Sequence, residues 1–205
     1  TMRTAEGGLS RLQDAEGALN EVTGLVARVK ELTVAASTDT NSASERQAIA
    51  VEVQQIREQL IALANTELGD QHVFSGFSNT TPPYDANGAF QGDVNVREVE
   101  LTPGNRLKTQ VNAADVFGGA PGSLDVLQLL DDVVVAMNAN DEANIRASLD
   151  TLDTARDQIL DGRQKLGAYM QSFEVARSTA ERAREISTIA RSDLLDADAF
   201  QSAND

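Results

Sequence analysis

Apolar residues recur at steps of three and four from residue 12 to residue 36. These positions are Leu12, Ala15, Leu19, Val22, Val26, Val29 and Ala36. The spacing predicts an amphipathic helix with a coiled-coil-like seam. Leu9, Leu25 and Leu32 widen the apolar stripe beyond a single seam. A stripe this wide needs more than one packing partner, so the pattern predicts a helical bundle rather than an isolated two-stranded coil.

A polar break at residues 37–42 separates this segment from a second helical repeat. Ser44, followed by Gln47, has the spacing of a capping box and predicts the start of the second helix. Its apolar seam consists of Ile49, Val53, Ile56, Leu60 and Leu63. Because the connection is short and polar, we expect the two helices to fold back on each other as an antiparallel hairpin.

The composition changes after residue 70. Five of the eight aromatic residues fall between residues 72 and 117, namely Phe74, Phe77, Tyr84, Phe90 and Phe117. Asn-Gly at residues 87–88 predicts a hairpin turn, and Pro-Gly at residues 103–104 predicts another. The pattern of this stretch therefore predicts a small β-rich insert with an aromatic core.

Alternating apolar residues predict three short strands in the insert, near residues 94–96, 99–101 and 107–111. The alternation slips by one residue at positions 97–98, where we expect a β-bulge. The single histidine, His72, is expected at the start of the first strand of the insert, as a structural or surface residue.

Helical spacing returns near the C-terminus. Ser123 is the expected N-cap of a third helix with Leu127, Leu130, Val134 and Met137 along its seam. Asp141 is the expected cap of a last helix of about fifty residues, or roughly 75 Å. The chain is thus predicted to be mainly α: an elongated antiparallel helical bundle with a small β-rich inserted domain. The expected division is a discontinuous rod domain, 1–70 and 123–205, and an outer insert, 71–122.

The net charge and the residue types present exclude several classes of partner and activity. With 17 Lys and Arg against 32 Asp and Glu, the net charge is −15, which repels nucleic acid and anionic lipid. No apolar run approaches the roughly 20 residues that cross a bilayer. The chain has one histidine and no cysteine, and no residues at the spacing of a nucleophilic, phosphate-binding or metal site. We therefore expect no enzymatic activity, cofactor, metal, nucleic-acid partner or membrane partner.

Three segments resemble a known family. ARVKELTVAASTDTNSASERQAIAVEVQQIREQLIALANTELGDQHVFSGF, residues 27–77, is similar to the first helical hairpin of the flagellin-like axial proteins of the bacterial flagellum, leading into their VFSGF strand. TPPYDANGAFQGD, residues 81–93, resembles a pattern of the hook-associated proteins at the hook–filament junction that flagellins generally lack. ISTIARSDLLDADAF, residues 186–200, resembles the passage into the family's final helix.

The resemblance implies a rod domain of long helices, a β-containing outer domain and a structural role in joining hook to filament outside the cell. The implied partners are further copies in a ring, a neighbouring hook-associated protein on the hook side and flagellin on the filament side. It also implies secretion through the flagellar type III export apparatus without a cleaved signal.

Two departures from the family pattern concern the ends of the chain. The LSTGKRI-like and SxxDDP-like signature of the family's N-terminal helix is absent, and the sequence stops soon after Asp198. The resemblance therefore implies a chain without its polymerising terminal helices. We expect such a chain to be monomeric at micromolar concentration.

Two other functions are compatible with these patterns. A flagellin would share the helical rod, although TPPYDANGAFQGD argues against it. A surface adhesin would act through exposed aromatic rings of the insert, with Phe77, Tyr84 and Phe90 as candidates.

The resemblance also points to a recognition surface. The hairpin segment that matches residues 27–77 is the part of flagellin that an innate immune receptor contacts, which makes Arg28 and Glu52 candidate recognition residues. The alternative is that both are ordinary solvent-facing charges.

Overall fold

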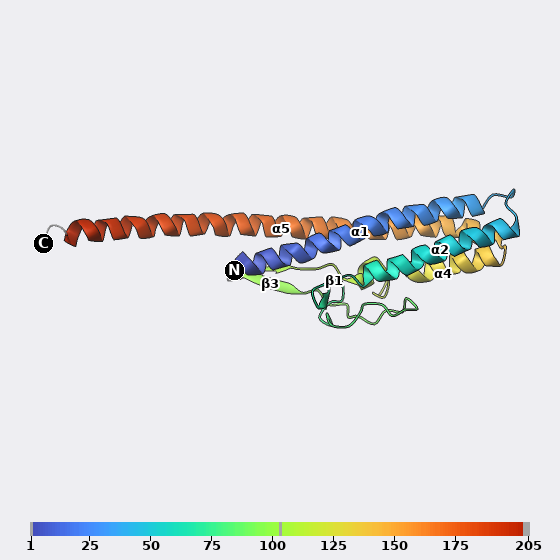
Figure 1. Cartoon of the computed structure of the whole chain (residues 1–205), viewed down its shortest axis with the longest axis horizontal. Coiled ribbons are helices and arrows are strands. Elements are labelled where there is room, and N and C mark those ends of the chain that lie inside the picture. The colour runs from blue at the N-terminus through green and yellow to red at the C-terminus, as the bar shows by residue number, and fades with distance from the viewer. Residues whose placement is uncertain (1, 103, 203–205) are drawn as a thin grey trace.

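Helices make up most of the chain, which is an elongated rod (Figure 1). The computed structural model describes residues 2–102 and 104–202. The described helices are α1 (Met2–Ala36), α2 (Ala43–Ala64), α3 (Ala113–Val116), α4 (Val126–Asn138) and α5 (Glu142–Ser202). The predicted class, a mainly α antiparallel bundle with a small β-containing insert, is confirmed.

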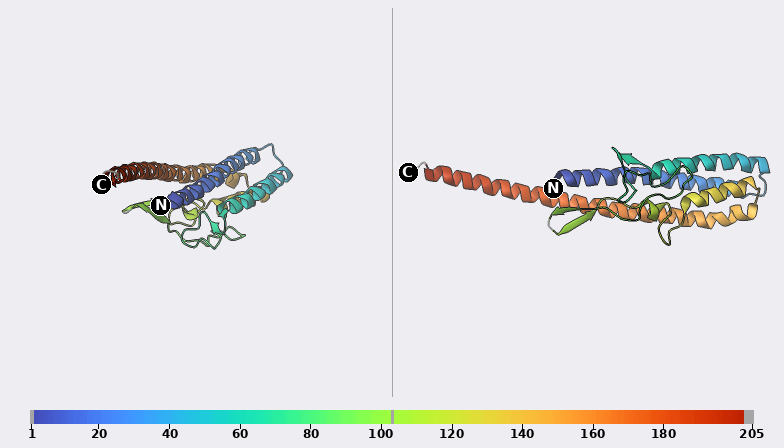
Figure 2. Two further views of the ribbon diagram at one scale, coloured as in Figure 1. Left: turned by 60° about the vertical axis from the view of Figure 1, so that its left-hand side comes forward. Right: turned by 90° about the horizontal axis from the view of Figure 1, so that it is seen from below.

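Helices α1 and α2 form one antiparallel hairpin, and α4 and α5 form another that packs against it, as the views in Figures 1 and 2 show. We call these four helices the rod. Every predicted seam residue of α1 is buried, as are Val53, Ile56 and Leu60 of α2. Ile49 and Leu63 are only partly buried, and Ala50 and Ala64 lie in the core beside them. The apolar period was therefore sufficient to predict the hairpins and their buried faces.

Two predicted helix caps are wrong by two residues. Helix α2 is capped by Ser42, whose side chain accepts a hydrogen bond from the Glu45 main chain while the Glu45 carboxylate accepts one from the Ser42 main chain at 2.7 Å. The sequence contains two overlapping capping signals, Ser42 with Glu45 and Ser44 with Gln47. The first forms the cap because its Glu45 carboxylate lies near the positive end of the helix dipole. Asp125, not Ser123, caps α4, because the Ser123 hydroxyl donates to the main chain of Ala120 instead.

Residues 71–122, which we call the outer segment, lie along one side of the rod. The strands there and just before it are short: β1 (Glu67–Leu68) pairs with β2 (Gln71–His72), and β3 (Glu98–Thr102) pairs with β4 (Asn105–Lys108), both antiparallel. The predicted turn at residues 87–88 is confirmed, since Tyr84 and Phe90 form an antiparallel bridge across it. At the second predicted turn, Pro103 lies outside the described residues, and Gly104 has a φ of 82°.

Other strand predictions need correction. Residues 94–96 form no strand, because the main-chain oxygens of Asp93 and Asn95 accept hydrogen bonds from the Asn112 side chain rather than from a neighbouring strand. The irregularity of the β3–β4 pair lies between Glu100 and Thr102, not at residues 97–98.

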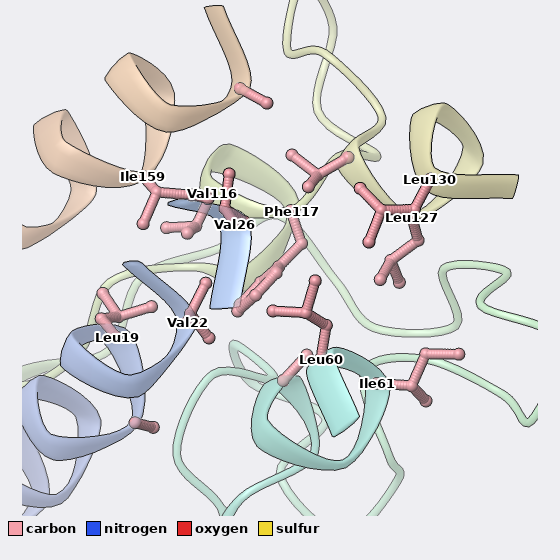
Figure 3. Packing of buried hydrophobic residues seen from close by; sticks show 14 of the residues in the cluster. Leu19, Val22, Val26, Leu60, Ile61, Val116, Phe117, Leu127, Leu130 and Ile159 are labelled. Atoms are coloured by element: carbon pink, nitrogen blue, oxygen red, sulfur yellow. The ribbon is translucent and has the colours of Figure 1, made fainter. Parts of the chain in front are cut away.

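Phe117 joins the outer segment to the rod. Figure 3 shows it between Val22 of α1, Leu60 of α2 and Leu127 of α4, and its side chain is fully buried. Its ring meets those of Phe74 and Tyr84 edge-on, each at a centroid distance of 6.1 Å. The aromatic core expected for the insert is therefore continuous with the aliphatic core of the rod.

Helix α5 is 61 residues long, longer than the predicted fifty, and Asp141 caps it as predicted, accepting from the Asn144 main chain at 3.1 Å. Among the described residues, its buried apolar residues lie between residues 145 and 173, namely Ile145, Leu152, Ala155, Ile159, Leu166 and Phe173. Beyond this it extends past the start of α1 (Figure 1), where Ile186 is 68% exposed. One helix thus has a packed part and a solvent-exposed part.

Candidate interaction surfaces

The two candidate recognition residues meet across the α1–α2 hairpin. The Arg28 guanidinium donates from Nε to Oε1 of Glu52 at 2.9 Å and from Nη1 to Glu31 at 3.3 Å. The side chains of Arg28, Glu31 and Glu52 are 50%, 70% and 44% exposed. The hydrogen bond with Glu52, followed by that with Glu31, raises the pKa of Arg28. The local arrangement follows from the fold, because antiparallel pairing of α1 with α2 puts both residues on the same outer face.

The candidate aromatic residues of an adhesin surface do not lie together on the surface. Tyr84 is buried, and its hydroxyl donates to the main-chain oxygens of Gly118 at 2.5 Å and Ala113 at 3.1 Å. Burial raises the pKa of Tyr84 far above its ordinary value. Phe90 packs against the Tyr84 ring at 5.5 Å, and Phe77 alone of the three is mostly exposed, at 60%.

His72 is held as a structural residue within β2. Its side chain is buried, with Nδ1 2.8 Å from the main-chain oxygen of Asn65 and Nε2 3.4 Å from the Glu67 carboxylate. No serine hydroxyl is paired with its ring among the residues that the structure describes.

Residues 2–102 and 104–202 contain no group of three His, Cys, Asp or Glu side chains arranged to hold a metal ion. No helix in these ranges is both long and apolar enough to span a bilayer.

One end of the rod carries the α1–α2 and α4–α5 turns, and we call it the distal end. It contains Arg46, a structurally important residue that the sequence pattern did not predict. Arg46 is 2% exposed and ties together both interhelical turns. It donates to the main-chain oxygens of Ala36 and Thr38 and to the side chains of Asn140 and Glu142, over distances from 2.6 to 3.0 Å. The sequence signal was weak: an arginine in the first turn of a helix, where a positive charge is unfavourable unless it has partners elsewhere.

Comparison with known sequences identifies relatives along nearly the whole chain. The family model of the bacterial flagellin N-terminal helical region matches residues 1–79. The chain is 31% identical over 209 residues to flagellin of Bacillus subtilis (strain 168), covering 96% of this chain and 67% of that protein. It is 26% identical over 206 residues to flagellar hook-associated protein 3 of Escherichia coli (strain K12), covering 89% and 65%. The chain thus spans about two thirds of the length of these relatives.

Solved structures share the fold. A crystal structure of Xanthomonas campestris FlgL matches with a TM-score of 0.83 at 19% identity, covering 93% of this chain and 96% of that one. Bacillus cereus FlgL matches with a TM-score of 0.75 at 25% identity, covering 90% and 92%. Bacillus cereus flagellin gives a TM-score of 0.63 at 17% identity, covering 87% and 89%.

A rod of two antiparallel helical hairpins with an outer segment on one side is therefore the architecture shared with axial proteins of the flagellum. The chain belongs to the bacterial flagellin family, whose members are structural proteins of the bacterial flagellum. This family membership agrees with the resemblance carried by residues 27–77.

Proposed function

We propose that this chain is part of a hook-associated protein that joins the hook to the filament of a bacterial flagellum. Its role is mechanical: copies of the protein pack around the flagellar axis outside the cell and connect two tubular assemblies. The proposed neighbours are further copies of itself, a second hook-associated protein on the hook side and flagellin on the filament side.

One observation supports the junction role above the others. The chain is more similar in both sequence and structure to the FlgL of Bacillus cereus than to the flagellin of the same organism. Because both come from one bacterium, differences between species do not account for the contrast. The hook-associated protein 3 of E. coli is also among the relatives that match over most of the chain.

A second candidate function is that of a flagellin. It is favoured by the 31% identity to the B. subtilis flagellin, which exceeds the 26% identity to the E. coli hook-associated protein. In this case the protein would form the filament itself rather than the junction.

Immunogold electron microscopy of intact flagella separates the two candidates. The antibody is raised against this chain and cleared of antibodies that cross-react with other flagellins. A single band of gold where hook meets filament is the expected result. Gold along the whole filament would instead identify a flagellin, and gold elsewhere on the cell would contradict both.

We also propose the recognition surface at Arg28 and Glu52 as a testable property of the hairpin. Its support is that the two side chains are exposed and joined at 2.8 Å on the outer face. Surface plasmon resonance with the immobilised flagellin receptor should detect binding that the Arg28→Glu variant lacks. The Arg106→Glu variant is the control, because Arg106 is also exposed, at 69% against 50% for Arg28, but lies on the β3–β4 hairpin. Absence of binding by the unmodified chain at micromolar concentration would contradict the proposal.

We further propose that residues 71–122 form the outer unit of the protein and that residues 1–70 and 123–205 form its rod. The buried contacts of Phe117 with both support a single cooperative folding unit.

We also propose that the isolated chain is monomeric at micromolar concentration. Light scattering at this concentration should give the mass of a monomer.

A further inference from the structure

Two arginines converge on one neutral acceptor beside the outer segment. Arg11 of α1 donates from Nη2 to Oε1 of Gln71 at 2.6 Å, and Arg97 donates from Nη1 to the same oxygen at 3.4 Å. Arg11 also donates from Nη1 to the main-chain oxygen of His72 at 3.2 Å. All three side chains involved are partly buried and partly open to solvent. We call Arg11 and Arg97 the basic pair.

Neither arginine of the basic pair forms an ion pair with a carboxylate of the described residues. Among the described residues, no carboxylate oxygen lies within 4.0 Å of either guanidinium, whereas Arg28 and Arg163 each have such a partner. Burial and the charge of Arg97 lower the pKa of Arg11, and the more distant Asp14 raises it. The chain has 32 acidic residues for 17 basic ones, so the missing partner does not reflect a shortage of carboxylates. Two partly buried like charges at one oxygen favour binding of an anion.

A complementary surface lies elsewhere on the same chain. Asp150, Asp157 and Asp161 of α5 are all exposed, and their spacing of seven and four residues puts them on one face of the helix. Asp150 and Asp161 have no cation within 4.0 Å among the described residues, and Asp157 lies 3.7 Å from its sequence neighbour Arg156. We call these three residues the acidic stripe.

The basic pair and the acidic stripe lie at different levels of the rod. Helices α1 and α5 are antiparallel, with Gly8 against Phe173 and Glu16 bonded to Arg163 at 2.6 Å. Arg11 is therefore level with the part of α5 between these two contacts, and the acidic stripe lies farther toward the distal end. With a helical rise of about 1.5 Å per residue, a second copy shifted by roughly 15–30 Å along the rod would bring its stripe level with the basic pair.

We propose that the basic pair binds the acidic stripe of a second copy of this chain. The contact joins two different surfaces, which is the heterologous type that builds open helical assemblies. Guanidinium groups bind carboxylates through paired, charge-assisted hydrogen bonds, and here Gln71 keeps the two groups together. This inference rests on the proposed function only in that copies of an axial protein pack side by side.

Sedimentation equilibrium of the chain, from micromolar to millimolar concentration, tests the contact. We expect monomers at the low end and self-association at the high end, weakened by added salt. Arg97→Glu should raise the dissociation constant roughly tenfold or more, since it puts like charges together. Arg106→Glu makes the same change of charge on the β3–β4 hairpin and should leave the dissociation constant unchanged.

Charge exchange makes the test specific to the two surfaces. The double variant Arg97→Glu/Asp161→Arg restores an opposite-charge pair and should associate like the unmodified chain. Circular dichroism confirms that each variant is folded, and Arg97→Gln replaces Arg97→Glu if the latter is not.

Three results would overturn the proposal: no association at millimolar concentration, association insensitive to position 97, or no recovery in the double variant. Binding of inorganic phosphate at Arg97 by a chain that stays monomeric, seen from its Nε–H resonance, would show a small-anion site instead. These association measurements are independent of the immunogold experiment that tests the junction role. The proposed contact and the junction role can therefore fail separately.

Discussion

The rod and the outer segment are both well packed, but different interactions hold them together. Along the rod, aliphatic side chains repeat at helical spacing, and each helix satisfies most of its own main-chain hydrogen bonds. The outer segment has short strands, so particular polar side chains bind its main chain. Asn65, for example, both accepts from and donates to the main chain of Tyr84, at 2.9 and 2.8 Å.

This difference determines which substitutions each region tolerates. A seam position in the rod needs an apolar side chain of about the right volume. Where the outer segment meets α5, Gln158 of α5 cannot be replaced by a residue of similar size. Its amide donates to the main-chain oxygens of Val116, in the outer segment, and of Leu124, just after it, and accepts from the Leu124 main chain. Loss of such a residue leaves buried main-chain groups without partners.

The largest effect is expected at Phe117, where the two regions share a core. Replacing it by alanine should lower the free energy of unfolding by about 3–5 kcal/mol, the usual range for a buried phenylalanine. Urea unfolding of the unmodified chain, followed by circular dichroism, should be a single transition, since Phe117 packs against both regions. Phe77→Ala, at an exposed position, should change stability by less than about 0.5 kcal/mol.

A transition that separates into two steps in the unmodified chain would show that the rod and the outer segment fold independently. The comparison between them would then describe two domains rather than two parts of one unit.

Next in size is the loss of Arg46, which holds the distal end of the rod by polar contacts. Arg46→Ala removes the side chain that donates hydrogen bonds to four acceptors. It also leaves the partly exposed Glu142 carboxylate without its closest cation. We expect a loss of about 2–3 kcal/mol in the free energy of unfolding, measured in urea. Arg106→Ala, which breaks an exposed ion pair, is the control and should cost less than about 1 kcal/mol. Equal losses for the two variants would show that the buried contacts of Arg46 add nothing.

The difference between the rod and the outer segment also explains which parts of the structure could be predicted from the sequence. The seams of α1 and α2 were predictable because a helix repeats its environment every few residues, and so was the turn at residues 87–88, where Gly88 has a φ of 83°. The missing strand at residues 94–96 depends on Asn112, far along the chain, and no local pattern indicates that contact. Arg46 and the basic pair were missed for the same reason, since their partners come from distant segments.

A smaller effect is expected where α3 of the outer segment packs closely against Gly162 of α5. A Cβ atom at Gly162 would lie 2.7 Å from Cγ2 of Val116, so Gly162→Ala forces α3 and α5 apart. We expect a net loss of about 1–2 kcal/mol, after allowing for the better helix propensity of alanine. Gly167→Ala, in the same helix but facing open space, should instead raise stability by about 0.5–1 kcal/mol. If both variants are stabilised in thermal or urea unfolding, the close packing at Gly162 is not a constraint.

A comparable but smaller loss is expected from the Tyr84 hydroxyl. Tyr84→Phe keeps the ring contacts with Phe90 and Phe117 and removes the hydrogen bonds to Gly118 and Ala113. The loss in urea unfolding should be about 1 kcal/mol, because the two carbonyl groups lose a buried donor. A stability equal to that of the unmodified chain would mean that the aromatic core needs only the ring.

The same hydroxyl makes the fold sensitive to alkaline pH. Folding raises the pKa of Tyr84 above its unfolded value of about 10, mainly through burial. The neutral phenol is therefore favoured in the folded chain, so its contribution is complete below about pH 10 and declines as the pH rises further. Because Tyr169 is the other tyrosine, Tyr169→Phe leaves one phenol to follow by tyrosinate absorbance. Tyrosinate should appear together with the loss of helical circular dichroism, and its appearance while the helices remain would show that the Tyr84 hydroxyl is open to solvent and that the outer segment is packed more loosely than the rod.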